Sequence, residues 1–130
     1  MFSSGSLIYD PQSLSVPTPG LWWLILECSP DLGRYYRQMV FKYTGQKLQK
    51  PAWDTHISVV RGEEPLKKEL WGRKEIVEFS YDPKLLTNDE YYWLEVKCDR
   101  LLDIREELGL PRIPKIGLHL TIGRKIGEFF

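Results

Sequence analysis

Two short segments carry the only histidines of this chain, and each places a hydroxyl group two residues after the imidazole. His56 is followed by Ser58 in the segment THISVVR, and His119 is followed by Thr121 in LHLTIGR. Both segments are mostly β-branched and aliphatic, so each is expected to form a strand. Because residues two apart on a strand share a face, each segment would present an imidazole beside a hydroxyl.

Such a set of groups is suited to the chemistry of phosphate esters. An unperturbed histidine has a pKa of about 6.5, so near neutrality one imidazole can take up a proton while the other donates one. Ser58 and Thr121 would donate hydrogen bonds to phosphate oxygens as negative charge develops on them. This mechanism needs no metal ion and no cofactor. The similar segments leave open which histidine is the base and which is the acid.

Two simpler interpretations compete with catalysis. A single histidine on a strand is more often structural than catalytic, but here both histidines occur in matching segments, which favours a shared site. Metal binding is disfavoured because neither histidine stands in a cluster with ligand spacing. Asp54 precedes His56 by two residues, whereas Gly117 occupies the corresponding position before His119.

The elements that would position these segments also occur twice. WLILECSPDL begins at Trp23 and WLEVKCDRLL begins at Trp93, and their Trp, Cys and Leu residues align at an offset of 70 (93 − 23). In this alignment Trp23 matches Trp93, and we expect both in the core. Cys28 matches Cys98, and two cysteines without clustered spacing are expected to be reduced core residues.

The pattern of strands, helices and turns predicts an α+β fold. Each copy runs from an apolar strand through a helix to its histidine strand, so we predict an internal repeat with lobes at about residues 21–62 and 75–126. Each lobe would have an antiparallel sheet and a covering helix, and the lobes would make a single domain over residues 21–130. Residues 1–20, rich in Ser and Pro, are expected to form an irregular N-terminal arm.

In its two histidine segments the chain resembles the 2H phosphoesterases, a superfamily with two His-x-Ser/Thr motifs on duplicated lobes. HISVV and HLTIG both fit the family pattern of His, apolar, Ser or Thr, apolar. The superfamily includes the LigT-like cyclic phosphodiesterases and the phage enzymes that degrade the cyclic oligonucleotide signals of CBASS defence. The resemblance implies a LigT-like fold and a catalytic set of His56, Ser58, His119 and Thr121. The chain is short for this family, with little room for inserted substrate loops.

Further ligand contacts are expected from Tyr9, Trp53, Arg61 and Arg124. The aromatic side chains could stack on a nucleobase, although packing is the commoner role. Each arginine lies five residues after its histidine. That odd spacing places it on the opposite face of the strand unless the strand ends or bulges first, and otherwise a solvated surface position is expected.

Composition limits the partners. Lys plus Arg and Asp plus Glu both number 18 among 130 residues, so the formal net charge is zero. Nothing in this balance favours long nucleic acid or a membrane surface, and we expect a small anionic ligand. No signal segment or membrane span is evident, which predicts a cytoplasmic protein, in the host cytoplasm if it is viral. The oligomeric state is left open.

These observations predict a metal-independent phosphodiesterase that cleaves cyclic nucleotides or cyclic oligonucleotide signals, with a viral counter-defence role as its most specific form. The first alternative is a 2′,3′-cyclic phosphodiesterase acting on RNA ends or nucleoside 2′,3′-cyclic phosphates. The second is a nucleotide-binding module without activity. Two titrating histidines disfavour that second alternative, since binding alone does not require them.

Overall fold

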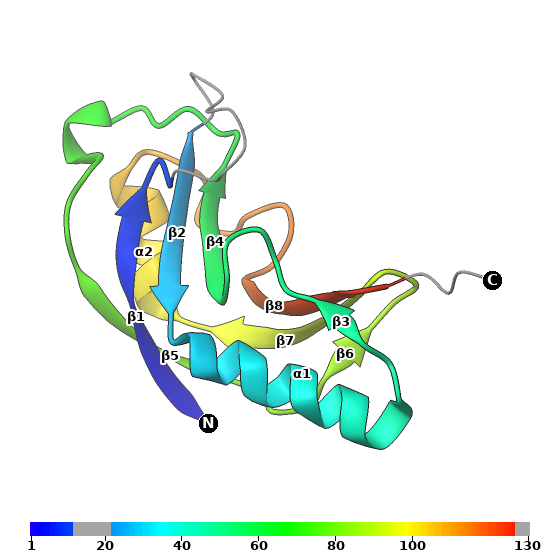
Figure 1. Cartoon of the computed structure of the whole chain (residues 1–130). Helices are drawn as coiled ribbons and strands as arrows, with labels where there is room; N and C mark the ends of the chain where they lie inside the picture. The colour runs from blue at the N-terminus through cyan, green and yellow to red at the C-terminus, as the bar shows by residue number, and fades with distance from the viewer. Residues whose placement is uncertain (12–21, 127–130) are drawn as a thin grey trace.

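The computed structural model describes residues 1–11 and 22–126 (Figure 1). Within these ranges the chain forms eight strands, two α-helices and one 3₁₀ helix. The elements are β1 (Phe2–Tyr9), β2 (Trp23–Cys28), α1 (Pro30–Thr44), β3 (Leu48–Gln49), β4 (His56–Arg61), η1 (Lys68–Leu70), β5 (Ile76–Tyr81), β6 (Leu86–Thr87), β7 (Tyr91–Lys97), α2 (Asp99–Glu107) and β8 (His119–Lys125).

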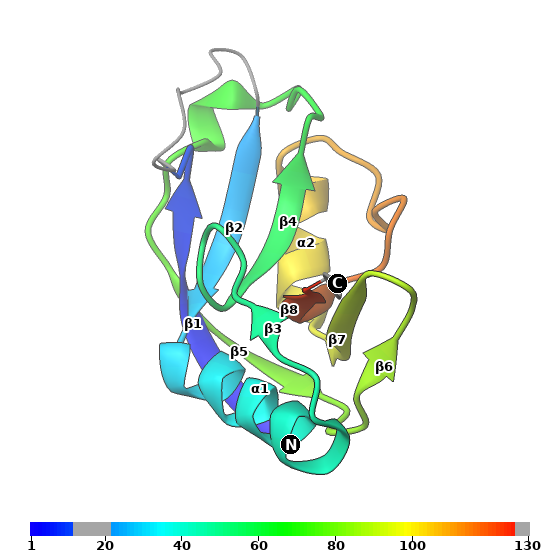
Figure 2. The same cartoon turned by 45° about the vertical axis from the view of Figure 1, so that its right-hand side comes forward.

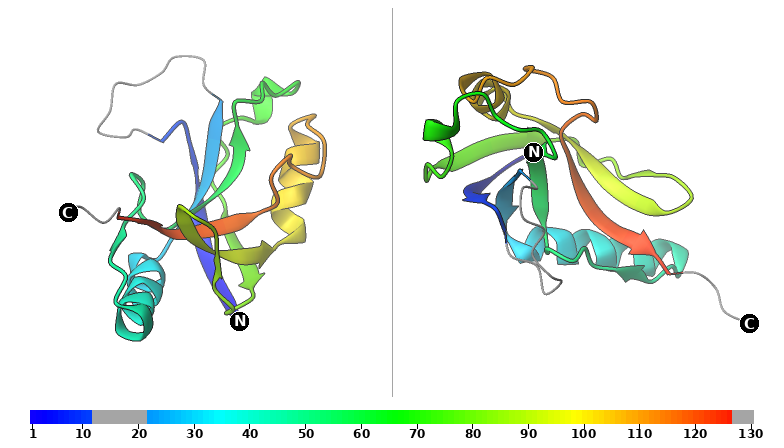
Figure 3. Two further views of the ribbon diagram at one scale, coloured as in Figure 1. Left: turned by 90° about the vertical axis from the view of Figure 1, so that its right-hand side faces the viewer. Right: turned by 90° about the horizontal axis from the view of Figure 1, so that it is seen from above.

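The described strands form one antiparallel sheet in the order β3-β8-β4-β2-β1-β5-β7-β6. β8 also pairs with β7, so β8, β4, β2, β1, β5 and β7 form a closed ring. In Figure 1, β1, β2 and β4 run upright while β7 and β8 run across them, and Figures 2 and 3 show this crossing from other sides. The α+β class is confirmed, but the two halves share one continuous sheet and do not have a separate sheet each.

The prediction of an irregular arm is wrong over Phe2–Tyr9, which form β1 within the ring. β1 pairs with β2 on one side and β5 on the other, so tertiary hydrogen bonding overrides the low strand propensity of its serines. Gly5 permits the close approach to β2, because a Cβ there would lie 2.3 Å from the Glu27 carbonyl oxygen. Residues 12–20 of the predicted arm lie outside the described residues.

The internal repeat is present, but its alignment differs from the prediction. Glu27 lies opposite His56 in β2–β4, and Glu95 lies opposite His119 in β7–β8. β2 and β7 therefore correspond at an offset of 68 (95 − 27), while β4 and β8 correspond at 63 (119 − 56). The predicted offset of 70 is wrong by two residues. It was set by identical Trp and Cys residues, whereas the true correspondence is set by the pairing of each strand with its histidine strand. Trp23 corresponds to Tyr91 and not to Trp93.

The repeat also begins earlier than predicted. Within the ring the order β4-β2-β1-β5-β7-β8 is symmetric about the β1–β5 pair, so β1 corresponds to β5. The first unit therefore covers residues 2–61 and the second covers 76–125, each with two long strands, a helix and a histidine strand. We refer to these as the first and second halves.

The helices cover the sheet in exchanged positions. α1 begins at the Ser29 cap, whose hydroxyl accepts a hydrogen bond from the Asp31 amide, and ends at Gly45 in the left-handed conformation. α1 lies against β8, and α2 lies against β4. Each helix therefore packs on the histidine strand of the other half, and Figures 1 and 2 show α1 along the lower side with α2 behind the upright strands.

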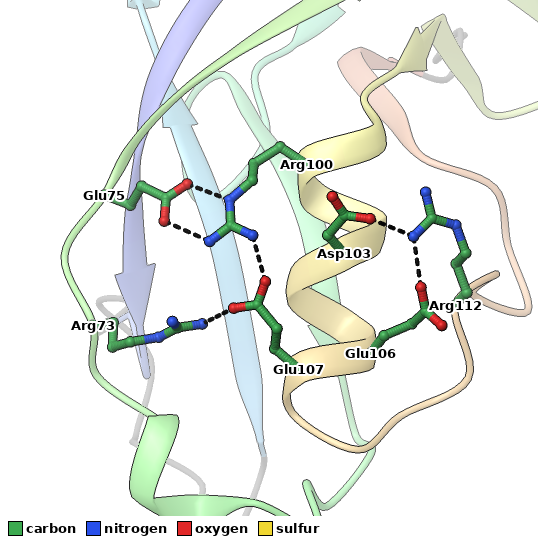
Figure 4. A network of polar contacts seen from close by, with 7 residues as sticks. All are labelled: Arg73, Glu75, Arg100, Asp103, Glu106, Glu107 and Arg112. Carbon is green, nitrogen blue, oxygen red and sulfur yellow. Dashed lines mark hydrogen bonds and ion pairs between the residues drawn. The ribbon is translucent and has the colours of Figure 1, made fainter.

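A network of ion pairs attaches α2 to the segment before β5 (Figure 4). Arg100 makes a bidentate contact with Glu75, at 2.7 and 2.8 Å, and also contacts Glu107. Arg73 donates to the same Glu107 carboxylate at 2.6 Å. The side chains of Arg100 and its partners are about one third exposed, so solvent screening reduces the stabilisation. The network serves to fix α2, not to form the site described next.

Candidate active site

The two histidine strands meet at one residue pair. Ile57 of β4 lies opposite Leu120 of β8, and both side chains are fully buried. One residue to either side, antiparallel register brings His56 next to Thr121 and Ser58 next to His119. Because side chains alternate along a strand, these four groups share the face opposite the buried pair. The sequence predicted the face, and the structure brings both motifs together on it.

All four residues line one cleft with a volume of about 1220 Å³. Its walls come from both halves, and three of the predicted ligand-binding residues, Trp53, Arg61 and Arg124, also line it. Lysines contribute further positive charge. They are Lys50, Lys97 and Lys115. A cleft of this size with basic groups near two imidazoles is suited to an anionic ligand larger than a single phosphate.

Both imidazoles are oriented by the backbone. His56 Nδ1 lies 2.7 Å from the Trp53 carbonyl oxygen, and His119 Nδ1 lies 2.8 Å from the Gly117 carbonyl oxygen. A carbonyl only accepts, so each Nδ1 carries the proton in these contacts. This leaves Nε2 of each ring as the atom available for proton transfer.

The surroundings of His56 favour its neutral form. Burial is the largest cause that lowers its pKa, and the neighbouring Arg61 and His119 side chains lower it further. The hydrogen bond to Trp53 acts in the opposite direction. Trp23 packs edge-on against the imidazole, with 5.8 Å between ring centroids. A neutral imidazole with a free Nε2 can act as a base near neutral pH.

The Ser58 hydroxyl is also oriented. The Trp23 indole N–H donates to Ser58 Oγ at 3.3 Å, so the hydroxyl proton is directed away from this contact. Trp23 was predicted to be a core residue, and that prediction is wrong, because Trp23 and Trp93 both line the cleft. Composition alone could not show this, because a strand with one face on the core and the other on a cleft is as rich in apolar and aromatic residues as a fully buried strand.

The two arginines reach the cleft through β-bulges. In β4, Ser58 faces Ile25 whereas Val60 faces Leu24, so Val59 is an extra residue. Arg61 therefore lies opposite Trp23, with its guanidinium 5.0 Å from the indole centroid. The odd spacing of His56 and Arg61 would place them on opposite faces of a regular strand, and this bulge brings Arg61 back to the face of His56.

β8 has the same bulge at the corresponding position. Thr121 faces Trp93 whereas Gly123 faces Tyr92, so Ile122 is the extra residue. Arg124 then lies opposite Tyr91, as Arg61 lies opposite Trp23. The two halves thus repeat imidazole, hydroxyl, bulge and arginine in one order.

Tyr9, predicted to bind ligand, does not line the cleft. It belongs to an aromatic cluster with Trp71 and Trp22, with 4.9 Å between the Tyr9 and Trp71 ring centroids. Burial raises the pKa of its hydroxyl. Packing is therefore the role that this structure supports for Tyr9.

The residue before His56 has an unusual backbone. Thr55 has φ of +38° and is fully buried, and a β-branched residue rarely adopts this conformation. Its hydroxyl donates to Asp54 at 3.0 Å, and its carbonyl accepts from the Cys28 amide. Such strain is commonly kept where a neighbouring side chain must be aimed, here that of His56.

In the described part of the chain, residues 1–11 and 22–126, no three His, Cys, Asp or Glu side chains are grouped to bind a metal ion. Over the same ranges no helix is long and apolar enough to cross a membrane. Compared with family models, curated proteins and solved structures, the chain has no significant match.

Proposed function

We propose that this protein is a metal-independent phosphodiesterase of the 2H phosphoesterase type, with a LigT-like fold, that cleaves cyclic nucleotides or cyclic oligonucleotide signals. One observation carries the proposal. Two imidazoles, each with Nδ1 bonded to a backbone carbonyl, share a face with two hydroxyls where β4 meets β8. This arrangement supplies a base, an acid and two hydrogen-bond donors to one phosphate.

The proposed reaction places the phosphate over the junction of β4 and β8. His56 Nε2 takes the proton of a ribose 2′-hydroxyl, whose oxygen forms a new bond to phosphorus. The bond from phosphorus to the 5′ oxygen breaks, and His119 donates a proton to that oxygen. The product is a 2′,3′-cyclic phosphate, which water opens in a second step with the histidine roles exchanged.

The remaining groups stabilise charge. Ser58 and Thr121 donate to the non-bridging oxygens, whose negative charge grows in the transition state. Arg61 and Arg124 line the same cleft and offset the charge of the ligand. The cleft volume of about 1220 Å³ favours an oligonucleotide over a mononucleotide.

A tethered nucleophile favours a substrate with 3′,5′ links. A neighbouring 2′-hydroxyl provides an effective molarity that reaches about 10⁵ M, whereas a free water molecule must be positioned by the protein. Cyclic oligonucleotides with 3′,5′ links carry such a hydroxyl beside every phosphate. Cleavage of these signals in the cytoplasm of an infected host would constitute the counter-defence role.

The test is a panel of 3′,5′-linked cyclic di- and trinucleotides, with their 2′-deoxy analogues as matched controls. We expect cleavage of the ribose compounds in excess chelator and binding without cleavage of the deoxy analogues. Turnover that requires an added divalent ion would refute the metal-independent mechanism. If nucleoside 2′,3′-cyclic phosphates are hydrolysed and the whole panel is inert, the RNA-end alternative is correct. Tight binding with no turnover of either class would support the binding module.

A further inference from the structure

Two helix arginines each donate a hydrogen bond to the carbonyl of a bulge residue. Arg37 of α1 has Nη1 3.0 Å from the Ile122 oxygen in β8. Arg105 of α2 has Nη1 2.9 Å from the Val59 oxygen in β4. A bulge leaves its extra residue without a partner in the ladder, and a buried carbonyl needs a donor from elsewhere. Both bulge residues are almost fully buried.

The two contacts are equivalent in the repeat. Arg105 follows Arg37 by 68 residues (105 − 37), the same offset that relates β7 to β2. Ile122 follows Val59 by 63 residues (122 − 59), the offset that relates β8 to β4. Each arginine reaches the histidine strand of the opposite half, because each helix packs there. The same contact therefore occurs twice, on helices whose N-termini are capped differently.

Both guanidinium groups are buried at some cost in free energy. The Arg37 side chain is 15% exposed and the Arg105 side chain 1%. Arg105 offsets this with a bidentate pair to Glu63, at 2.8 and 2.9 Å, and Arg37 contacts Asp54 at 3.3 Å. Each buried charge is therefore both paired with a carboxylate and hydrogen-bonded to a bulge carbonyl, as a buried guanidinium must be.

The acidic partners belong to segments next to site residues. Asp54 accepts from the Thr55 hydroxyl immediately before His56, and Glu63 lies two residues after Arg61 and lines the cleft. Each helix arginine thus connects a bulge with a second segment of the candidate site. Without the bulges, the five-residue spacing would turn Arg61 and Arg124 to the core face.

We propose that Arg37 and Arg105 are positioning residues that hold the two bulges and so keep Arg124 and Arg61 on the cleft face. Arg37 acts through the Ile122 bulge on Arg124. Arg105 acts through the Val59 bulge on Arg61. The consequences for phosphate binding and turnover rest on the proposed function, whereas the consequence for the bulges does not.

The test uses Arg37→Met, with Arg34→Met as the matched control. Arg34 is on the same helix, is 61% exposed and pairs only with Asp31 among the described contacts. We expect Arg37→Met to weaken binding of inorganic phosphate about tenfold, as loss of a charge-assisted contact does, and Arg34→Met to leave it unchanged. Nuclear Overhauser contacts between Tyr92 and Gly123 report the β8 bulge, and we expect Arg37→Met to abolish them.

A double-mutant cycle separates positioning from general stability. If Arg37 acts through Arg124, Arg37→Met adds nothing in an Arg124→Ala background but keeps its full effect in an Arg61→Ala background. Arg37→Lys retains a donor for the Ile122 carbonyl, so it is expected to restore the bulge and most of the affinity. Arg105→Met is the second variant, with the mirrored dependence on Arg61.

Two results would overturn the proposal. One is an intact Tyr92–Gly123 contact in Arg37→Met, and the other is an equal loss of affinity in both arginine backgrounds. A wild-type protein that cleaves no phosphodiester would refute the proposed function instead. The Tyr92–Gly123 contact would still decide whether Arg37 holds the bulge.

Discussion

The half that carries His56 and the half that carries His119 contain the same parts in the same register, yet they surround their imidazoles differently. His56 packs edge-on against Trp23 and follows the strained Thr55, and burial lowers its pKa. His119 lies opposite Glu95 of β7, and no aromatic ring packs against it among the described aromatic pairs. Its hydrogen bond from Nδ1 to the Gly117 carbonyl is exposed to solvent. Duplication therefore supplies two equivalent groups, and their surroundings make them unequal.

This inequality favours a division of roles. In the proposed reaction, the histidine whose surroundings favour the neutral form accepts the proton and its partner donates one. The sequence motifs are too similar to make this assignment. It depends on how deeply each imidazole is buried and on whether an aromatic ring packs against it, and both depend on the fold.

The largest predicted effect distinguishes the roles of the two histidines by using substrates with different leaving groups. His56→Ala and His119→Ala are each expected to lower kcat about 10²- to 10⁴-fold on a nucleotide substrate. On an aryl phosphodiester, whose leaving group needs no proton, His119→Ala should recover most of its activity and His56→Ala should not. Equal recovery of both variants, measured as kcat/KM, would show that the roles are not divided as proposed.

The next effect concerns the hydroxyls. Ser58→Ala and Thr121→Ala are each expected to lose about 2–4 kcal/mol of transition-state stabilisation, because each removes one donor to the phosphate oxygens. Trp23→Phe removes the indole donor to Ser58 while keeping an aromatic ring beside His56 and Arg61, and it is expected to cost about 1 kcal/mol. In a double-mutant cycle, the part of this cost that acts through the Ser58 hydroxyl should vanish in a Ser58→Ala background and persist in a Thr121→Ala background. Unchanged rates in both hydroxyl variants would make these residues structural.

Much of the site could be predicted from sequence because its signals are local. The His-x-Ser/Thr spacing fixes which groups share a face, and strand propensity fixes the strands around His56 and His119. The bulges at Val59 and Ile122 were not predictable, since nothing in those residue types marks an extra residue in a ladder. The strand β1 is not predictable from its own sequence for a related reason. Its pairing with β2 and β5 is set by partners distant in sequence, not by its own serine-rich composition.

A smaller effect is predicted for the pH dependence of stability. Because the pKa of His56 is lowered in the folded state, the unfolded chain binds its proton more readily below a pH of about 6.5. The contribution of His56 to stability is therefore present above that pH and is lost as the pH falls through the lower, folded-state value. Imidazole shifts in NMR should report a pKa for His56 below that of a free imidazole side chain, and Arg61→Ala should raise it. A pKa of His56 above 6.5 would contradict the assignment of His56 as the base.

The smallest effect concerns the two cysteines, which the strand register places in different surroundings. An offset of 70 would make Cys28 and Cys98 equivalent, but the strand register makes Cys28 correspond to Val96 and leaves Cys98 at the start of α2. Both thiols are free and buried, as predicted.

Their reactivities should nevertheless differ. Burial raises the pKa of Cys28 to about 12, and burial also raises that of Cys98, where hydrogen bonds from backbone amides of the helix act in the opposite direction. We therefore expect iodoacetamide to modify Cys98 before Cys28 in the folded protein, and both at one rate after denaturation, as followed by mass spectrometry of the digested chain. Added reductant should leave the melting temperature unchanged. Equal rates in the folded state would contradict the different surroundings of the two thiols, one at the end of β2 and the other at the start of α2.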